Sequence, residues 1–229
     1  MVSENLKSVE ARIQAACDRA GRKRSDVLLV CVTKTHPVEL CQEAYDCGER
    51  NFGENKVQEI EKKKPLLPED VRWHMIGHLQ TNKVKQVIDK AVLIHSVDSE
   101  HLAKEISKQA GKLGITVPIL VEVNAAKEES KWGVYPEDAE EFVRTIAPLP
   151  NIQVRGLMTS APYTENPESN RQYFRLMREL CIDIRNKNID NVAMCELSMG
   201  MTGDFEVAVE EGATIVRIGT AIFGARDYT

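Results

Sequence analysis

Two segments of this chain carry residue types that could do chemistry together. Lys34 follows the apolar run 27–33, whose β-branched residues predict a strand buried on both faces. An amine partly withdrawn from water is a nucleophile suited to Schiff-base formation, whereas a lysine whose charged end merely reaches solvent is the structural alternative. Gly219 and Thr220 follow a second apolar run, 215–218. An amine nucleophile and a Gly-Thr anion cradle together suggest an aldehyde cofactor that carries a phosphate.

The Gly-Thr pair has the chemistry of an anion site. Gly219 and Thr220 lead into 221–223, a predicted short helix, and backbone N–H groups at a helix start bind phosphate directly. The hydroxyl groups of Thr220 and, from the preceding loop, of Ser198 add further donors. A glycine turn followed by a capped helix is the structural alternative, and the two residues alone do not distinguish these interpretations.

Arg217 lies two residues before Gly219, so the period of a strand places both on the same side. A guanidinium that points into the interior of a fold needs a partner. Glu122 and Glu196 are candidate partners, and the functional alternative is the ring nitrogen of a pyridine. Arginine stays protonated and would keep that nitrogen unprotonated, which makes the ring a weaker electron sink than one paired with a carboxylate.

His74 and His78 have the spacing of two metal ligands on a helix, but they flank the turn 75–77. No H-E-x-x-H motif, C-x-x-C pair or P-loop occurs, and no Ser/His/Asp triad can be recognised. We therefore expect these histidines to make an oriented polar contact at the mouth of the fold, and we expect no metal site.

Strand and helix signals alternate along the chain after a leading helix at 6–20. The predicted strands are 27–33, 51–53, 71–76, 91–97, 116–123, 152–157, 192–197 and 214–218. Such alternation implies parallel strands joined by helical crossovers. Eight units in 229 residues predict an α/β fold, a single (β/α)8 TIM barrel domain over residues 1–229. An open doubly wound sheet is the alternative, and the absence of a G-x-G-x-x-G turn weakens its dinucleotide-binding form.

A barrel would bring scattered residues to one place, because the carboxyl ends of its parallel strands emerge at the same face. The residues that fall at or just past predicted strand ends are Lys34, Asn55, His78, Met158, Ser198, Arg217 and Gly219. Their convergence is a consequence of the barrel and fails if the sheet is open.

The composition limits the classes of function. A formal net charge of -5 gives no general attraction to nucleic acid or to anionic membranes, and no apolar stretch is long enough to span a bilayer. Residues 1–7 lack the apolar core of a signal peptide, and the six cysteines form no C-x-x-C pair, which favours free thiols in a reducing cytoplasm. The basic clusters 22–24 and 62–64 are predicted to be solvated helix ends.

Several longer motifs occur in a fixed order along nearly the whole chain. They are VTKTHP at 32–37, FGENKVQE at 52–59, WHMIGHLQTNK at 73–83, KWG at 131–133, GLMT at 156–159, ELSMGM at 196–201 and VRIGTAIFG at 216–224. In these motifs the chain resembles the YggS/PROSC family of pyridoxal-phosphate homeostasis proteins. It departs from the family pattern at Thr202, where serine is common, and at His36, where lysine is common.

The resemblance implies a barrel like the N-terminal domain of alanine racemase, the type III fold of proteins that bind pyridoxal 5'-phosphate (PLP). It implies that PLP is held as a Schiff base on Lys34, that Arg217 lies near the ring nitrogen, and that the phosphate is bound by Ser198, Gly219 and Thr220. It further implies that the cofactor is lined by Asn55, His78 and Met158.

Two functions of different classes follow from the resemblance. The first is a non-catalytic protein of vitamin B6 homeostasis, which holds or delivers PLP, contacts PLP-dependent apo-enzymes transiently and works as a monomer in the cytoplasm. The alternative is a small PLP-dependent amino-acid racemase. A third interpretation is a barrel enzyme that acts on a phosphosugar. It explains the phosphate cradle but accounts less well for Lys34 and Arg217.

The racemase alternative needs a second acid/base group on the opposite face of the cofactor. In alanine racemases that group is a tyrosine of a partner subunit, supported by a second domain, whereas this sequence ends at Thr229. Tyr135, Tyr163 and His36 are candidate replacements, and nothing in the sequence places them there. We therefore expect a carrier of PLP without strong catalytic activity of its own.

Overall fold

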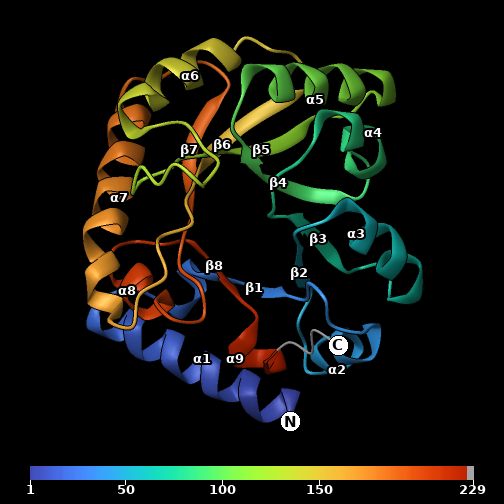
Figure 1. Ribbon diagram of the computed structural model, residues 1–229, viewed down its shortest axis with the longest axis vertical. Helices are drawn as coiled ribbons and strands as arrows, with labels where there is room; N and C mark the ends of the chain where they lie inside the picture. The colour runs from blue at the N-terminus through green and yellow to red at the C-terminus, as the bar shows by residue number, and fades with distance from the viewer. Residues whose placement is uncertain (226–229) are drawn as a thin grey trace.

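Eight parallel strands close into a barrel in which each strand pairs with the next along the chain and β8 pairs with β1 (Figure 1). The structure is a computed structural model and describes residues 1–225. The strands in this range are β1 (Leu28–Val32), β2 (Asn51–Glu54), β3 (Arg72–Met75), β4 (Ala91–Val97), β5 (Val117–Glu122), β6 (Ile152–Met158), β7 (Val192–Ser198) and β8 (Ile215–Ile218). The predicted closed barrel is confirmed, because in an open sheet β1 and β8 would not pair with each other.

Helices form a ring outside the barrel (Figure 1). They are α1 (Val2–Arg19), α2 (Val38–Asp46), α3 (Val57–Lys63), α4 (Val84–Val87), α5 (Glu100–Leu113), α6 (Ala139–Ile146), α7 (Arg171–Asn186), α8 (Phe205–Glu210) and α9 (Thr220–Phe223). Helix α4 is short, and a 3-10 turn at Thr81–Lys83 precedes it. The reason is that β4 already begins at Ala91, which leaves space for about one α-helical turn.

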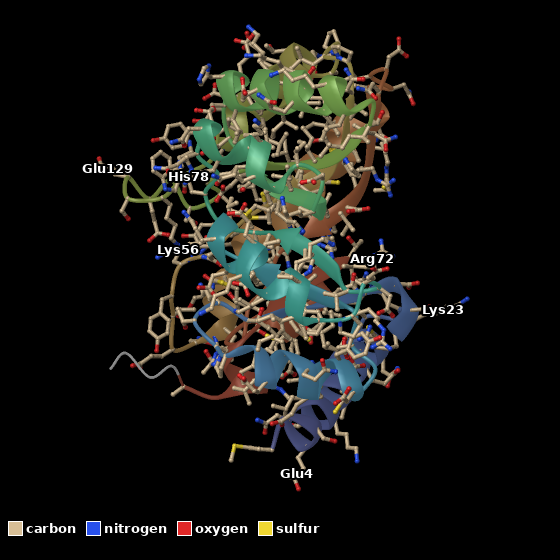
Figure 2. The ribbon with its side chains drawn as sticks, turned by 90° about the vertical axis from the view of Figure 1, so that its right-hand side faces the viewer. Glu4, Lys23, Lys56, Arg72, His78 and Glu129 are labelled. Carbon is tan, nitrogen blue, oxygen red and sulfur yellow. The ribbon has the colours of Figure 1, made fainter. Side chains whose placement is uncertain are left out.

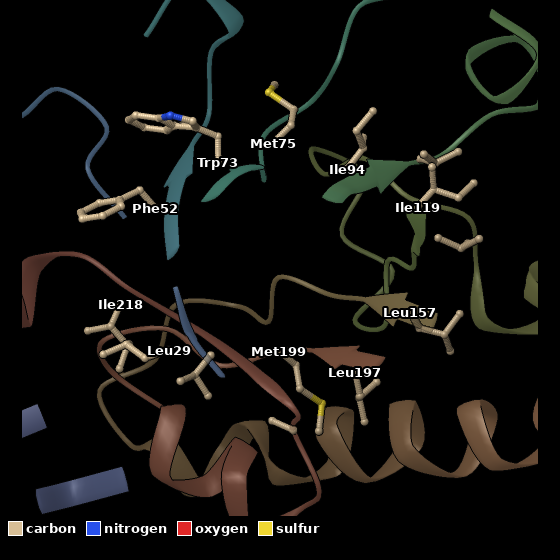
Figure 3. Close-up of a cluster of buried hydrophobic side chains, with 14 of the residues drawn as sticks. Leu29, Phe52, Trp73, Met75, Ile94, Ile119, Leu157, Leu197, Met199 and Ile218 are labelled. Atoms are coloured by element: carbon tan, nitrogen blue, oxygen red, sulfur yellow. The ribbon is translucent and has the colours of Figure 1, made fainter. Parts of the chain in front are cut away.

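Side chains of the strands alternate between two apolar cores. The larger core lies between strands and helices, and Figure 3 shows some of its members, among them Phe52, Trp73 and Ile119, pointing away from the middle of the ring of strands. A smaller core fills part of the barrel lumen and consists of Val30, Leu93, Leu120, Met158 and Ile215. The lumen is therefore packed with side chains and is not a pore, as in other barrels of this kind.

The predicted leading helix is present as α1, which lies outside the ring against α2, α8 and α9 (Figure 1). Its buried stripe includes Leu6, Val9 and Ile13, at the spacing of one helix face. On its polar side Arg19 pairs with Glu210 at 2.6 Å. The helix thus covers the segment of the ring in which the chain returns to close the barrel.

The basic cluster 62–64 departs from its prediction. Lys62 is exposed as expected, but Lys63 is only 3% exposed. It lies on the same face of α3 as Val57 and Ile60, at intervals of three residues, and that spacing is the signal by which its burial could have been predicted. The prediction of a fully solvated cluster was therefore wrong for this lysine.

The thiols divide into two groups. Cys17, Cys31, Cys41 and Cys181 are buried, whereas Cys47 and Cys195 are exposed, and all of them are free. Within residues 1–225, none of the helices combines the length and the apolar composition that crossing a membrane requires.

Candidate functional site

The two ends of the barrel lie on opposite sides of the molecule. Lys56, His78 and Glu129 belong to loops that follow the carboxyl ends of strands, and Figure 2 shows all three on one side. Arg72, the first residue of β3, lies on the other side. We call the first side the mouth, and the predicted site residues are located by reference to it.

Lys34 lies in a tight turn at the carboxyl end of β1. The amide of His36 donates to the carbonyl of Thr33 at 3.0 Å, which makes Lys34 the second residue of a hydrogen-bonded turn. The third residue, Thr35, has a φ of 66°, in the left-handed region, which costs a β-branched residue about 1–3 kcal/mol. Lys34 is half-buried. A strained turn therefore holds this lysine at the mouth.

A buried ion pair lies beneath the turn. Lys63 Nζ is 2.7 Å from Glu54 Oε1 and donates to the carbonyl of Thr33 at 2.8 Å, and the Thr33 hydroxyl donates to the same carboxylate oxygen. Burial raises the pKa of Glu54, and the charge of Lys63 opposes that rise. Thr33 directly precedes Lys34. Glu54 directly precedes Asn55, so the ion pair fixes the ends of β1 and β2 together.

Asn55 and His78 lie where the loops after β2 and β3 approach each other. A Cβ on Gly77 would lie 2.4 Å from the carbonyl oxygen of Asn55, so only glycine fits between the two loops. His78 Nδ1 lies 3.3 Å from Asp98 Oδ2. The ring of His78 stacks on Trp132, with centroids 3.8 Å apart and planes inclined by 14°. The motif residues of three different loops therefore meet at the mouth.

A series of hydrogen bonds crosses the lumen below the mouth. Arg217 Nη1 donates to Ser198 Oγ at 2.6 Å, and Ser198 Oγ lies 2.9 Å from His95 Nδ1. His95 Nε2 lies 3.0 Å from His74 Nδ1, and His74 Nε2 lies 3.1 Å from Asn51 Oδ1. These five residues come from β2, β3, β4, β7 and β8, and we call them the lumen network.

The lumen network corrects one expectation and adds a residue that the sequence interpretation missed. His74 was expected at the mouth, but it lies inside the barrel because β3 continues to Met75. The sequence interpretation did not name His95. This residue interrupts the apolar run 91–97, and that interruption is the signal by which it could have been identified. Burial lowers the pKa of His74 to about 3 and lowers the pKa of His95 well below its usual value. Both rings are therefore neutral near pH 7.

Arg217 does not have the partners that its charge suggested. It donates to neutral oxygens, namely Ser198 Oγ, the Thr159 carbonyl at 2.8 Å and Ser160 Oγ at 3.5 Å. Glu196 pairs instead with Arg155 at 2.9 Å. Burial lowers the pKa of Arg217 to about 10, and the charge of Glu122 opposes that fall without a hydrogen bond between them. Within residues 1–225, the Nε of Arg217 and the second hydrogen of Nη1 donate to no acceptor.

Glu122 should make the stability of the cofactor-free protein depend on pH. Burial, and then the charge of Asp98, raise the pKa of Glu122 from 4.5 to about 7. The unfolded chain releases this proton at a lower pH than the folded protein, so the contribution of Glu122 to stability is lost as the pH rises from about 4.5 to 7. We expect Glu122→Gln to be more stable than wild type at pH 8 by about 1–3 kcal/mol, relative to their difference at pH 5.

Urea unfolding of both proteins at the two pH values measures this change. The exposed carboxylate of Glu129 offers a matched control, and Glu129→Gln should show the same difference from wild type at pH 5 and at pH 8. An equal effect of pH on Glu122→Gln and wild type would show that Glu122 is ionised in the folded protein throughout this range.

The Gly-Thr segment lies at the end of β8, and Gly219 is the residue before α9. A Cβ on Gly219 would lie 3.0 Å from the Val32 carbonyl oxygen, so the segment packs closely against β1. The first amides of a helix have no acceptor within it. Thr202 Oγ1 accepts a hydrogen bond from the amide of Ala221 at 3.4 Å. Thr202, noted in the sequence only as a departure from a family pattern, therefore brings a further hydroxyl to the exposed Thr220.

Ser198 and Met158 lie deeper than the other predicted site residues. The Ser198 hydroxyl belongs to the lumen network, and Met158 is 1% exposed in the lumen core. No group of three or more His, Cys, Asp or Glu side chains in residues 1–225 is arranged to hold a metal ion. The mouth thus offers an amine, a cation with unused hydrogens and the start of a helix, which together suit a ligand with a carbonyl, a ring acceptor and an anionic group.

The chain is similar over nearly its whole length to known proteins. The pattern of the family described as "Alanine racemase, N-terminal domain" matches residues 5–227. A "Pyridoxal phosphate homeostasis protein" of Aquifex aeolicus is 52% identical over 98% of this chain and 98% of its own length. A protein of the same name from Pseudomonas aeruginosa is 39% identical over 99% of this chain and 96% of its own length.

Solved structures show the same fold. PipY of Synechococcus elongatus, in a structure with PLP bound, is 34% identical with a TM-score of 0.84 and covers 98% of this chain and 100% of its own. An alanine racemase of Clostridium difficile shares the fold at a TM-score of 0.76 but is 14% identical, and the match covers 98% of this chain and 57% of the racemase. This chain therefore belongs to the family of the alanine racemase N-terminal domain and, within it, to the pyridoxal phosphate homeostasis proteins.

Proposed function

We propose that this protein binds PLP in vitamin B6 homeostasis and holds or delivers it through a Schiff base on Lys34, without strong catalytic activity of its own. The observation that carries the proposal is the position of Lys34, in a strained turn on a buried ion pair at the mouth of the barrel. A relative of the same fold over the full chain, PipY, has been solved with PLP bound.

Three regions of the mouth are assigned to three parts of the cofactor. Lys34 provides the amine for the carbonyl carbon, and Arg217 provides its unused N–H groups for the ring nitrogen. The phosphate is assigned to Ser198, Gly219 and Thr220, and the remaining lining to Asn55, His78 and Met158. When bound, PLP supplies an electrophilic carbonyl and a conjugated ring. The residues themselves bind the phosphate, orient the ring and keep a proton on Arg217 rather than on the ring nitrogen.

Support for the phosphate assignment comes from the hydrogen-bond donors at the start of α9. Gly219 and Thr220 present the first amides of this helix, and the hydroxyl groups of Thr220 and Thr202 lie beside them. The hydroxyl of Ser198 is already engaged by Arg217 and His95. Its assignment to the phosphate therefore rests on the resemblance alone, whereas its contacts support a role in holding Arg217.

Within residues 1–225, the exposure of the two candidate tyrosines favours a carrier over a racemase. Tyr163 is 94% exposed, and Tyr135 is 42% exposed. His36 is buried, and its ring centroid lies 5.3 Å from that of Phe223. A proton donor must reach the reacting carbon within hydrogen-bond distance, directly or through one water. The monomeric state, the cytoplasmic location and transient contact with PLP-dependent apo-enzymes belong to the same proposal.

The proposal predicts transfer of PLP without turnover of amino acids. Protein loaded with PLP should reactivate a PLP-dependent apo-enzyme, measured beside a control with the same concentration of free PLP. In D2O the loaded protein should not exchange the α-hydrogen of L-alanine, as followed by proton NMR. A kcat/KM for racemisation of about 10^4 M⁻¹s⁻¹ or more, which is the ordinary range of enzymes, would instead establish the racemase.

A further inference from the structure

The lumen network is an unusual filling for a barrel. Barrels of this kind are normally filled with branched apolar residues, yet His74, His95 and Ser198 are 2%, 0% and 0% exposed here, beside the apolar residues of the lumen core. A buried polar group without a partner costs about 1–3 kcal/mol. Such a network is stable only if every member is satisfied, so the direction of each hydrogen bond can be derived.

The direction follows from Arg217, which can only donate. Ser198 Oγ accepts from Arg217 Nη1, and within the described residues its own hydrogen then has His95 Nδ1, at 2.9 Å, as its acceptor. With a lone pair at Nδ1, His95 carries its hydrogen on Nε2 and donates to His74 Nδ1. His74 in turn carries its hydrogen on Nε2 and donates to Asn51 Oδ1. Each hydrogen in this series has an acceptor.

The reverse direction is worse on two counts. If His95 donated from Nδ1, the hydrogen of Ser198 would have no acceptor within the network. His74 would then face the Asn51 oxygen with an unprotonated nitrogen unless the amide of Asn51 were turned over. A charged ring is also excluded, since an imidazolium has no lone pair for Ser198. The low pKa values of both histidines, which burial causes, agree with neutral rings.

We propose that His95 is a positioning residue for Arg217, because its unprotonated Nδ1 fixes the hydroxyl of Ser198 and so aims the guanidinium at the mouth. This inference deepens the proposed function, on which it rests for the identity of the ligand. Asn51 and His74 set the tautomer of His95 from the far side of the lumen. Glu122 on β5 and Asp204 before α8 are the acidic groups whose charges act on Arg217, and neither accepts a hydrogen bond from it within the described residues.

Nitrogen NMR tests the direction without any ligand. The chain contains five histidines, and the variants His74→Gln and His95→Asn assign two of their rings. In cofactor-free protein at pH 7 we expect both rings to be neutral with the hydrogen on Nε2. Hydrogen on Nδ1 of His95, or a charged ring, would overturn the proposal, and neither result depends on whether the protein binds PLP.

A pair of ligands tests the effect on Arg217. The probes are PLP and 1-deazapyridoxal phosphate, in which a carbon replaces the ring nitrogen and accepts no hydrogen bond. Wild type should bind PLP more tightly by about ten-fold or more, the value of one hydrogen bond to a charged group. His95→Leu and Ser198→Ala should reduce this preference to about three-fold or less. His95→Asn, whose amide oxygen can replace Nδ1, should keep most of it.

Ser96→Ala is the matched control for Ser198→Ala. Ser96 is also fully buried on a strand of the barrel, but its hydroxyl has no partner in the described residues, so its loss should leave the ligand preference unchanged. If His95→Leu fails to fold, Ser198→Ala carries the test alone. An unchanged preference in Ser198→Ala would refute the positioning role. Wild type that binds neither compound would refute the proposed function instead and leave the NMR result to decide the network.

Discussion

Replacement of Lys34 with alanine is expected to abolish covalent binding of PLP. Loaded wild type should be yellow, and borohydride should fix the cofactor to Lys34 irreversibly. Lys34→Ala has no amine at this position, so no Schiff base can form there, and the whole covalent signal should be lost. The measurements are the absorption spectrum and peptide mapping after reduction.

Two features make this result specific. Lys34 is half-buried in a loop, so its loss should change the free energy of unfolding by about 1 kcal/mol or less, and the contacts to ring and phosphate should still bind PLP weakly. Lys56→Ala is the matched control, because Lys56 is an exposed lysine on the same side of the molecule (Figure 2). A borohydride adduct of wild type on another lysine would refute the assignment, and an unfolded Lys34→Ala would indicate a structural lysine.

Replacement of Lys63 with methionine is expected to be strongly destabilising. Methionine preserves much of the volume but leaves Glu54 buried without its counter-charge, and breaking a buried ion pair in this way costs about 3–5 kcal/mol. That is a large part of the total stability of a domain, which is about 5–15 kcal/mol. The carbonyl of Thr33 also loses a donor, so the turn that holds Lys34 should loosen. Urea unfolding and PLP affinity measure the two effects.

The adjacent lysine gives the control. Lys62→Met changes the same type of residue at an exposed position and should cost about 0.5 kcal/mol or less. The double variant Lys63→Met with Glu54→Gln should recover part of the loss, since it removes the unpaired charge. Equal losses for Lys62→Met and Lys63→Met would mean that the ion pair contributes little to the fold.

The barrel and most residues of its mouth could be predicted because the signals are local. Short apolar runs alternate with amphipathic segments, and this order alone requires parallel strands with crossovers. Once the strands are parallel, the residue after each carboxyl end is at the mouth, which is how Lys34 and Gly219 were found. The same argument places His78 in the loop after β3, where the structure has it.

The interior could not be predicted in the same way. His95 and Ser96 are adjacent and both are buried, and the register of β4 against β5 shifts between Ile94 and Val97. Strict alternation is lost at such a shift, so counting along the sequence does not tell which side chain enters the lumen. The partners of His95 also lie 21 and 103 residues away. Only the closed barrel brings them within hydrogen-bond distance.

Neither candidate acidic partner of Arg217 hydrogen-bonds to it, for a related reason. Charge alone suggested Glu122 or Glu196, but a buried guanidinium can also be satisfied by hydroxyl and carbonyl oxygens, as here. The sequence does not show which of these acceptors a buried arginine uses, because backbone carbonyls are present at every position. The consequence is that Arg217 keeps hydrogens for a ligand.

The closure of the sheet also determines which part of this protein can bind another macromolecule. In residues 1–225 every strand has a hydrogen-bonded neighbour on each side, so no strand edge is available for a foreign strand to extend the sheet. Handover of a small molecule to a recipient enzyme would therefore proceed through the loops of the mouth, where Trp132 is 59% exposed and Met201 is 38% exposed. Recognition would depend on the shape and composition of these loops, which can change without altering the framework beneath them.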